Sequence, residues 1–302
     1  MSWQARFMKS VARLTLRRSL ARARALPDLR TRLDRSAKRF FHPPPFTAMV
    51  PGSVGGVPGL WVTNRPRSKA VVLYFHGGFY MIGRPESDAA MMAALASRSG
   101  AQVFLPRYRL APEHPFPAAF EDALAAFNGL LALGYAPGQI ILAGASAGGG
   151  LSLALLAHLL KAGQQPAGAF AFSPWTDLTY SGASLVTNAA HEHMLPAHRL
   201  TEVRAAILGR SNAQGAADVR LSPLHALFPA PPPVRLYAAD TEILRDDTLR
   251  MRNRLPKAEI KLGGDLPHVW PLFHNILPEA RVTLDETAGF IQSCLDQSSG
   301  ES

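Results

Sequence analysis

The stretch QIILAGASAGGGLSLALLAHLL, residues 139–160, carries no formally charged side chain and restricts the fold more than any other segment. Its length would suffice for a membrane-spanning helix, which needs about 20 apolar residues. Several glycines interrupt its middle, however, and each glycine destabilises a helix by about 1 kcal/mol relative to alanine. We therefore interpret the stretch as a strand, a glycine-rich turn around Ser146 and a helix, all buried in a soluble α/β protein.

Strands and helices alternate along the chain from residue 70 onwards. Short apolar runs predict strands, and longer helix-forming runs between them predict helices. Such alternation is typical of a parallel, doubly wound sheet. The Pro- and Gly-rich segments 42–46 and 51–59 predict an irregular connection before it. The expected strands are 70–76, 101–106, 139–144, 167–173, 232–240 and 257–263, and the expected helices are 87–99, 116–133, 147–161, 245–255 and 279–297.

The net charge of +10 belongs to an N-terminal arm. Residues 1–40 hold twelve Lys and Arg against two Asp, and the basic and acidic residues of the remaining chain cancel. A neutral body lacks the broad basic surface of a nucleic-acid-binding protein, so we expect no nucleic-acid partner. The lone cysteine, Cys294, excludes an intramolecular disulfide and is compatible with a reducing compartment. A cytoplasmic protein is the resulting expectation.

The arm has the pattern of an amphipathic helix. Trp3, Phe7, Val11 and Leu14 recur at helical spacing, with arginines between them. The arm lacks the apolar run of 7–15 residues that a secretory signal peptide requires. Three interpretations stay open: a solvated helix that covers part of the body, a helix that brings residues 1–40 into peripheral contact with an anionic membrane, and an organellar presequence.

Residues 144–148 read Gly-Ala-Ser-Ala-Gly and match the pattern G-x-S-x-G between the expected strand and helix. A sharp turn there would expose the Ser146 hydroxyl at a helix N-terminus, where backbone N–H groups favour an anion. Neither G-x-G-x-x-G nor G-x-x-x-x-G-K-[ST] occurs, which argues against nucleotide binding. Ser146 is therefore a candidate nucleophile, and a serine nucleophile needs a base and an oxyanion hole.

An oxyanion hole is suggested by His76-Gly77-Gly78, which ends the expected strand 70–76. Two consecutive glycines can turn their N–H groups towards the same point as the N–H of Ala147. We predict Gly77, Gly78 and Ala147 as the donors. Without Ser146 downstream, an ordinary Gly-Gly loop would be the preferred interpretation.

Six segments resemble, in order, the sequence blocks of the hormone-sensitive-lipase-like (bacterial family IV) esterases of the α/β-hydrolase superfamily. The resemblance runs from about residue 50 to the C-terminus. It implies an α/β-hydrolase fold, with a basic N-terminal helical cap at 1–45 and a catalytic domain at 46–302 that contains a helical cap insertion at about 177–218. The six segments are YFHGGFYMIG (74–83), YRLAPEHPFPAAFEDA (108–123), GASAGG (144–149), SPWTDLT (173–179), RLSPL (220–224) and LPHVWPLF (266–273).

The resemblance also implies the partners of the serine. The family's P-H dipeptide matches at His268, which is the expected base and follows the acid in chain order. Aligning Leu244 and Asp246 with the family motif D-P-L-x-D puts Glu242 at the position of the acid. Asp240 is the alternative acid, since it lies only two residues away.

Other residues of the expected site are secondary. Phe79 replaces the family's third oxyanion glycine, and we expect it to narrow the pocket and contact the substrate. His274 is a weaker candidate for the base than the histidine of the P-H dipeptide. His191 and His193 form H-x-H without a nearby Cys or HExxH spacing, so we expect no metal.

The sequence thus predicts a serine carboxylic-ester hydrolase that needs no cofactor and uses a Ser-His-Glu triad with an acyl-enzyme intermediate. The resemblance implies small-molecule esters with short to medium acyl chains. Two alternatives are a catalytically silent, receptor-like binding protein and an amidase, lactonase or acyltransferase with the same triad. The natural substrate is not determined by the sequence, and a homodimer is left open.

Overall fold

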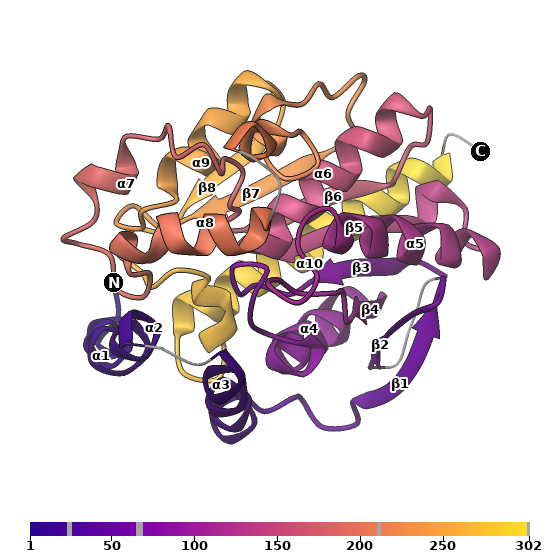
Figure 1. The fold of residues 1–302 in the computed structure, drawn as a ribbon. Coiled ribbons are helices and arrows are strands. Elements are labelled where there is room, and N and C mark those ends of the chain that lie inside the picture. Colours follow the sequence, from indigo (N-terminus) through magenta and orange to yellow (C-terminus); the bar gives the residue numbers. More distant parts are fainter. Residues whose placement is uncertain (23–25, 65–68, 210–212, 301–302) are drawn as a thin grey trace.

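The computed structural model describes residues 1–302 apart from 23–25, 65–68, 210–212 and 301–302. The strands of this part form one eight-stranded sheet at the centre of the molecule, in the order β1-β2-β4-β3-β5-β6-β7-β8 (Figure 1). The β1-β2 and β2-β4 pairs are antiparallel, and the other neighbours are parallel. The strands are β1 (Ala48–Val54), β2 (Val57–Thr63), β3 (Val71–Phe75), β4 (Gln102–Pro106), β5 (Ile140–Ala145), β6 (Gly168–Phe172), β7 (Val234–Ala238) and β8 (Glu259–Leu262).

Helices cover both faces of the sheet, and each face has its own hydrophobic core. Helices α4 (Pro85–Ser99) and α10 (Pro278–Gly300) pack on one face, and α5 (Ala118–Ala132) and α6 (Ala147–Lys161) pack on the other. The short α9 (Arg245–Arg250) follows β7. The alternating strands and helices predicted from residue 70 onwards are confirmed, and so is the α/β-hydrolase architecture. Strands β3, β5 and β6 are buried throughout, as expected of parallel strands between two helical layers.

The expectation of an irregular connection at 51–59 is wrong. Strands β1 and β2 form an antiparallel hairpin there, joined at Gly55-Gly56, whose φ angles are 60° and 79°. Glycine adopts such positive φ angles without strain, so the two glycines make a tight hairpin turn. Pro51 is tolerated because β1 lies at the edge of the sheet and can lack one N–H donor.

The N-terminal arm is helical, as predicted. It comprises α1 (Trp3–Ala12), a π-helical turn (Arg13–Arg17), α2 (Arg18–Arg22) and α3 (Leu26–Phe40), which lie beside the catalytic body (Figure 1). Helix α1 packs on the body through Ala5, Met8 and Ala12, which are buried. Of the predicted apolar face, by contrast, Trp3, Phe7 and Leu14 point outwards, and Val11 is half-buried. Among the described helices, none is long and apolar enough to cross a bilayer.

The insertion at 177–218 is helical and contains no strand among its described residues, as predicted. Its helices are α7 (Ser184–Thr187) and α8 (Leu200–Leu208), joined by irregular segments. Arg199 precedes α8 and donates to the carbonyls of Leu20 and Ala21, at 3.2 Å each, so the insertion lies directly against the arm.

Candidate active site

Ser146 occupies the sharp turn between β5 and α6. Its φ and ψ angles are 53° and −120°, a conformation that costs a non-glycine residue roughly 1–3 kcal/mol. The turn also requires glycine on both sides. A Cβ at Gly148 would lie 2.1 Å from the Phe75 carbonyl oxygen, and a Cβ at Gly144 would lie 2.2 Å from the Gly148 carbonyl oxygen. The strained turn thereby places the Ser146 hydroxyl at the N-terminus of α6.

His268 and Glu242 form a buried pair. Nδ1 of His268 lies 2.8 Å from Oε2 of Glu242, and the two side chains are 4% and 1% exposed. Nε2 of His268 is buried and has no hydrogen-bond partner within the described part of the chain. Burial raises the pKa of Glu242, and hydrogen bonding from His268 opposes that rise. A carboxylate at Nδ1 favours the tautomer that leaves Nε2 free to accept a proton.

The loops that carry these residues are tied to neighbouring points of the sheet. The Ser146 N–H donates to the Phe172 carbonyl at 2.9 Å, at the carboxyl end of β6. The next residue, Ser173, accepts from the Val269 N–H at 3.1 Å through its hydroxyl. Because Val269 follows His268, the loop of this candidate base is anchored at Ser173, next to the Phe172 carbonyl that anchors Ser146.

The structure distinguishes Glu242 from the alternative acid, Asp240, and from the nearby Asp246. Asp240 has a side chain 45% exposed, with Arg245 3.8 Å away. Asp246 accepts a hydrogen bond from the N–H of Ser184 in the insertion. The alternative base, His274, is buried after β8 and makes no hydrogen bond to a carboxylate among the described residues.

The loop after β3 approaches the serine closely. A Cβ at Gly77 would lie 3.4 Å from the Ser146 Cβ, and one at Gly78, where φ is 120°, would lie 2.2 Å from a main-chain oxygen. His76 supports this loop. Its ring stacks on Tyr108 with centroids 4.3 Å apart, and the Tyr108 hydroxyl donates to the His76 carbonyl at 2.7 Å. Burial lowers the pKa of His76 to about 4, which makes it a neutral support.

The backbone N–H groups near Ser146 differ in whether an acceptor within the protein already interacts with them. The carboxyl of Asp88 accepts from the Tyr74 hydroxyl at 2.9 Å and interacts with the Gly77 N–H. Within the described residues, no hydrogen bond engages the N–H groups of Gly78, Phe79 or Ala147. These three amides are therefore available to a ligand beside Ser146, whereas that of Gly77 faces Asp88.

Comparison with known proteins places this geometry in a family. A family model for the α/β-hydrolase fold matches residues 72–270. An acetyl-hydrolase from Streptomyces hygroscopicus is 36% identical over 80% of this chain and 81% of its own length. An esterase from Acinetobacter venetianus is 31% identical over 96% of this chain and 97% of its own. The crystal structure of an esterase from the bacterial hormone-sensitive lipase family superposes with a TM-score of 0.91 at 32% identity, covering 98% of this chain and 99% of that one.

This chain belongs to the hormone-sensitive-lipase-like esterases of the α/β-hydrolase superfamily. The predicted family is confirmed, and the esterase is a carboxylesterase-type hydrolase.

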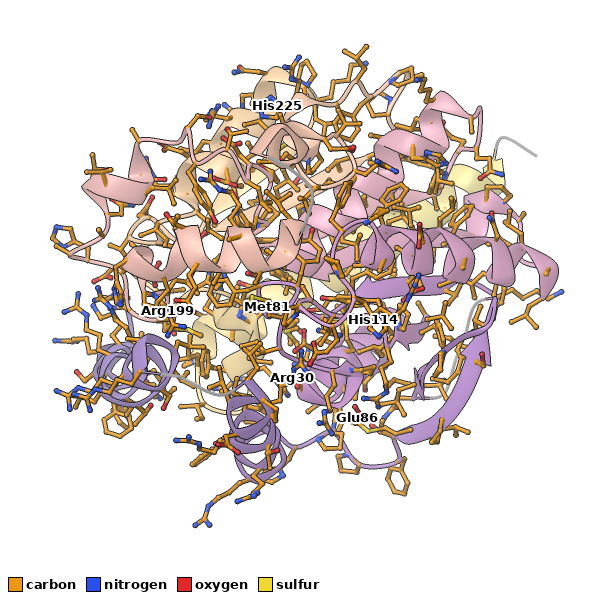
Figure 2. All side chains as sticks on the ribbon, in the orientation of Figure 1. Arg30, Met81, Glu86, His114, Arg199 and His225 are labelled. Atoms are coloured by element: carbon orange, nitrogen blue, oxygen red, sulfur yellow. The ribbon has the colours of Figure 1, made fainter. Side chains whose placement is uncertain are left out.

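The esterase has an apolar cleft of about 260 Å³ between the arm, the loop after β3 and the insertion. Phe79 lines this cleft and packs edge-to-face on Trp175, with ring centroids 6.1 Å apart. The arm wall is held by Arg30 of α3, which donates to the Met81 carbonyl at 2.8 Å and pairs with Glu113 (Figure 2). The other apolar residues of the lining are Leu20, Leu26, Leu29, Met81, Ile82, Pro112, Pro196, Leu200, Val203 and Ala206.

A second buried carboxylate supports the loop of Glu242, the candidate acid, and no sequence pattern predicted it. Glu192, in the insertion, is 1% exposed and accepts from the Ile243 N–H at 2.9 Å. Asn188 donates to the carbonyls of Asp240 and Glu242, both at 2.9 Å. The main chain around Glu242 is therefore fixed by the insertion. The sequence carried no signal for this, because the contacts join segments more than fifty residues apart.

Asp265 joins the arm to the loops that carry the candidate acid and the candidate base. It lies three residues before His268 and accepts hydrogen bonds from Lys9 of α1, from His193 of the insertion and from Thr241. Burial would raise the pKa of Asp265, but these three hydrogen bonds outweigh it and lower the pKa to about 2. His193 of the H-x-H pair thus has a carboxylate partner. No cluster suited to a metal ion is found among the described residues.

Proposed function

We propose that the esterase hydrolyses carboxylic esters with short to medium acyl chains through Ser146, His268 and Glu242. The observation that carries this proposal is the buried pair of His268 and Glu242, whose Nδ1 and Oε2 atoms lie 2.8 Å apart. The Nε2 atom of His268 has no hydrogen-bond partner among the described residues, and the loop of His268 is anchored beside the strained turn of Ser146. The nucleophile, the acid and the base follow one another in the chain order of α/β-hydrolases.

Acylation begins when Oγ of Ser146 attacks the ester carbonyl carbon. Nε2 of His268 takes the hydroxyl proton, and the resulting imidazolium is stabilised by the carboxylate of Glu242. The tetrahedral intermediate collapses, the C–O bond to the alcohol breaks, and His268 returns the proton to the leaving oxygen. Deacylation repeats the sequence with water as the nucleophile and releases the carboxylic acid and free Ser146.

The oxyanion of the intermediate needs backbone donors beside Ser146. Of the predicted donors, Gly78 and Ala147 keep this role in our proposal. The orientation of the Gly77 N–H towards Asp88 favours the Phe79 N–H as the third donor, with Gly77 supporting the loop. Phe79 has a φ of 58°, which turns its amide away from a regular strand or helix. Its ring would contact the acyl group, as the sequence analysis expected.

The cleft that Phe79 lines has a volume of about 260 Å³, below the 300–1,000 Å³ of a typical pocket for a drug-sized ligand. Ser146, Glu242 and His268 are not among its lining residues, so this volume does not set the length of the acyl chain. The relative from Streptomyces hygroscopicus is an acetyl-hydrolase, which is consistent with a small acyl group. The paired acid and base argue against the receptor-like alternative. Amides, lactones and acyl transfer use the same residues, and their turnover is compared with that of esters below.

The test is ester turnover by Ser146→Ala and His268→Ala, each checked for folding by its thermal melt. We expect kcat on p-nitrophenyl butyrate to fall by about 10³-fold or more, and the double variant to be about as inactive as either single one, because these residues act as a unit. An alkyl phosphonate should label the native esterase once, at Ser146. A folded Ser146→Ala variant that keeps most of its activity would refute the proposal. Parallel assays with the matched butyramide and butyrolactone rank ester, amide and lactone hydrolysis.

A further inference from the structure

The two faces of helix α1 are used differently. Ala5, Met8 and Ala12 lie on the face that packs on the body and are at most 6% exposed. Trp3, Phe7 and Leu14 lie on the opposite face and are 70%, 59% and 56% exposed. Each residue of a helix is rotated by about 100° about the helix axis, so these three side chains point in directions that differ by at most about 40°. They therefore form one stripe along the helix. Scattered apolar side chains are ordinary on a surface, but an ordered stripe with Trp and Phe marks an interaction site.

The charges around this stripe have one sign. Residues 3–22, which cover α1, the π-helical turn and α2, contain six Lys and Arg and no Asp or Glu. Lys9 is bound to Asp265, and Arg17 donates to carbonyls of the insertion. The side chains of Arg6, Arg18 and Arg22 are exposed. Figure 2 shows nitrogen-tipped side chains projecting outwards from this part of the arm.

An exposed aromatic stripe flanked by arginines is the chemistry of an interfacial helix. Such a helix lies in the plane of a membrane, with Trp and Phe among the acyl chains and Arg against lipid phosphates. A second copy of this chain would bring the exposed arginines of the two arms, Arg6, Arg18 and Arg22, face to face, and their repulsion disfavours that arrangement. An anionic bilayer instead complements the charge and the stripe at the same time.

We infer that the outer face of α1 and α2 docks the esterase on the surface of an anionic lipid bilayer. Trp3, Phe7 and Leu14 enter the headgroup region, and Arg6 and Arg18 pair with lipid phosphates. The arm also provides Leu20 as a wall of the apolar cleft. Docking therefore brings one wall of that cleft to the lipid surface, where apolar esters concentrate.

Vesicle sedimentation of the full chain tests this inference. The vesicles contain phosphatidylcholine with about 30 mol % phosphatidylglycerol, since anionic lipid attracts a basic segment. We expect Trp3→Ser/Phe7→Ser/Leu14→Ser to weaken binding by at least about 10-fold. The matched control is Val186→Ser/Leu227→Ser, which removes apolar side chains 81% and 77% exposed elsewhere. It should bind within about twofold of the native chain.

Salt, lipid charge and fluorescence give independent measurements. Binding should weaken by at least about 10-fold in pure phosphatidylcholine and in about 0.5 M NaCl, because salt screens the attraction. Brominated lipids should quench Trp3, the most exposed of the four tryptophans, and Trp3→Phe should remove that quenching. Turnover of p-nitrophenyl butyrate in solution should be unchanged in the triple variant.

Two results would overturn the inference. One is equal vesicle binding by the native chain, the triple variant and the control. The other is a native dimer, seen by sedimentation velocity, that the triple variant abolishes and that anionic vesicles leave intact. The second result would assign the same face to self-association.

Discussion

Glu242 differs from its acidic neighbours in burial and in partner. It is fully enclosed and paired with His268, whereas Asp240 is half exposed beside an arginine and Asp246 holds the insertion. A carboxylate in that position can stabilise the imidazolium only if it keeps its charge. Burial works against that charge by raising the pKa of Glu242, and the hydrogen bond from His268 opposes the effect.

Glu242→Gln should lower kcat on a short-chain ester by about 10²–10⁴-fold. The amide keeps the volume but loses the charge, and its NH₂ group can hold the His268 ring in the wrong tautomer. Steady-state kinetics on folded protein measure the change. The controls Asp240→Asn and Asp246→Asn should retain far more activity. An inactive Asp240→Asn beside an active Glu242→Gln would reassign the acid.

Asp88 should make the free energy of unfolding of the protein depend on pH. Burial is the largest cause that raises its pKa, to about 6, against the hydrogen bonds from Tyr74 and Gly77. The pKa in the unfolded chain is about 4, so the folded protein holds a proton that the unfolded chain releases. The stabilising contribution of the neutral carboxyl is complete below about pH 4 and is lost as the pH rises through about 6.

Asp88→Asn cannot ionise, so its free energy of unfolding relative to the native chain should rise by about 2 kcal/mol between about pH 4.5 and about pH 7.5. Urea denaturation at both pH values measures the difference. The same difference at both values would mean that the pKa of Asp88 is not raised on folding.

Among the larger elements, the insertion holds the acid loop. Glu192 accepts a hydrogen bond from the Ile243 N–H, and Asn188 donates to two carbonyls of the same loop. The insertion thus fixes this loop although it contributes no side chain to the proposed triad. Glu192 is therefore a positioning residue for Glu242. Arg13 and Arg17 of the arm bind carbonyls between residues 189 and 192, which extends this support to the N-terminal helices.

Glu192→Gln should lower kcat/KM by about 10-fold to 100-fold, because an NH₂ group would face a main-chain N–H and displace the acid loop. Removing the Glu192 charge should also move the acidic limb of the pH profile to lower pH, since it makes protonation of the triad less favourable. A purely structural defect would leave that limb in place. Glu259→Gln, at a 52% exposed side chain in β8, is the matched control and should change neither quantity.

For the molecule as a whole, the arm lies outside the sheet but contacts the loop before His268 through Lys9, and the insertion through Arg13 and Arg17. Deleting residues 1–22 should leave a folded protein, because the strands begin at β1 and this segment contributes only Ala5 and Met8 to the buried clusters that flank the sheet. The deletion removes the Lys9–Asp265 contact and the arginine contacts to the insertion, so kcat/KM should fall by about 10-fold or more.

Circular dichroism, thermal melts and turnover of p-nitrophenyl butyrate measure the effect of this deletion. Native activity in the shortened protein would show that the arm does not position the catalytic loops. Complete loss of solubility would show instead that the surface under Ala5, Met8 and Ala12 must stay covered.

Local patterns predicted much of this esterase. The uncharged run at 139–160 predicted β5 and α6, because apolar composition and the steric demands of glycine act over neighbouring residues. Alternation along the chain predicted the other parallel strands for the same reason. The hairpin at 48–63 escaped notice because proline and glycine were interpreted as breaking a strand, whereas at an edge they are compatible with one.

Long-range contacts account for the rest. The spacing of Trp3, Phe7 and Leu14 predicted a helix, but it was the body that selected the opposite face, through Ala5 and Met8, for burial. Glu192 reaches across 51 residues to the acid loop, and Lys9 across 256 residues to Asp265. No local pattern encodes such pairs, because hydrogen bonds between distant segments depend on how the completed sheet brings its loops together.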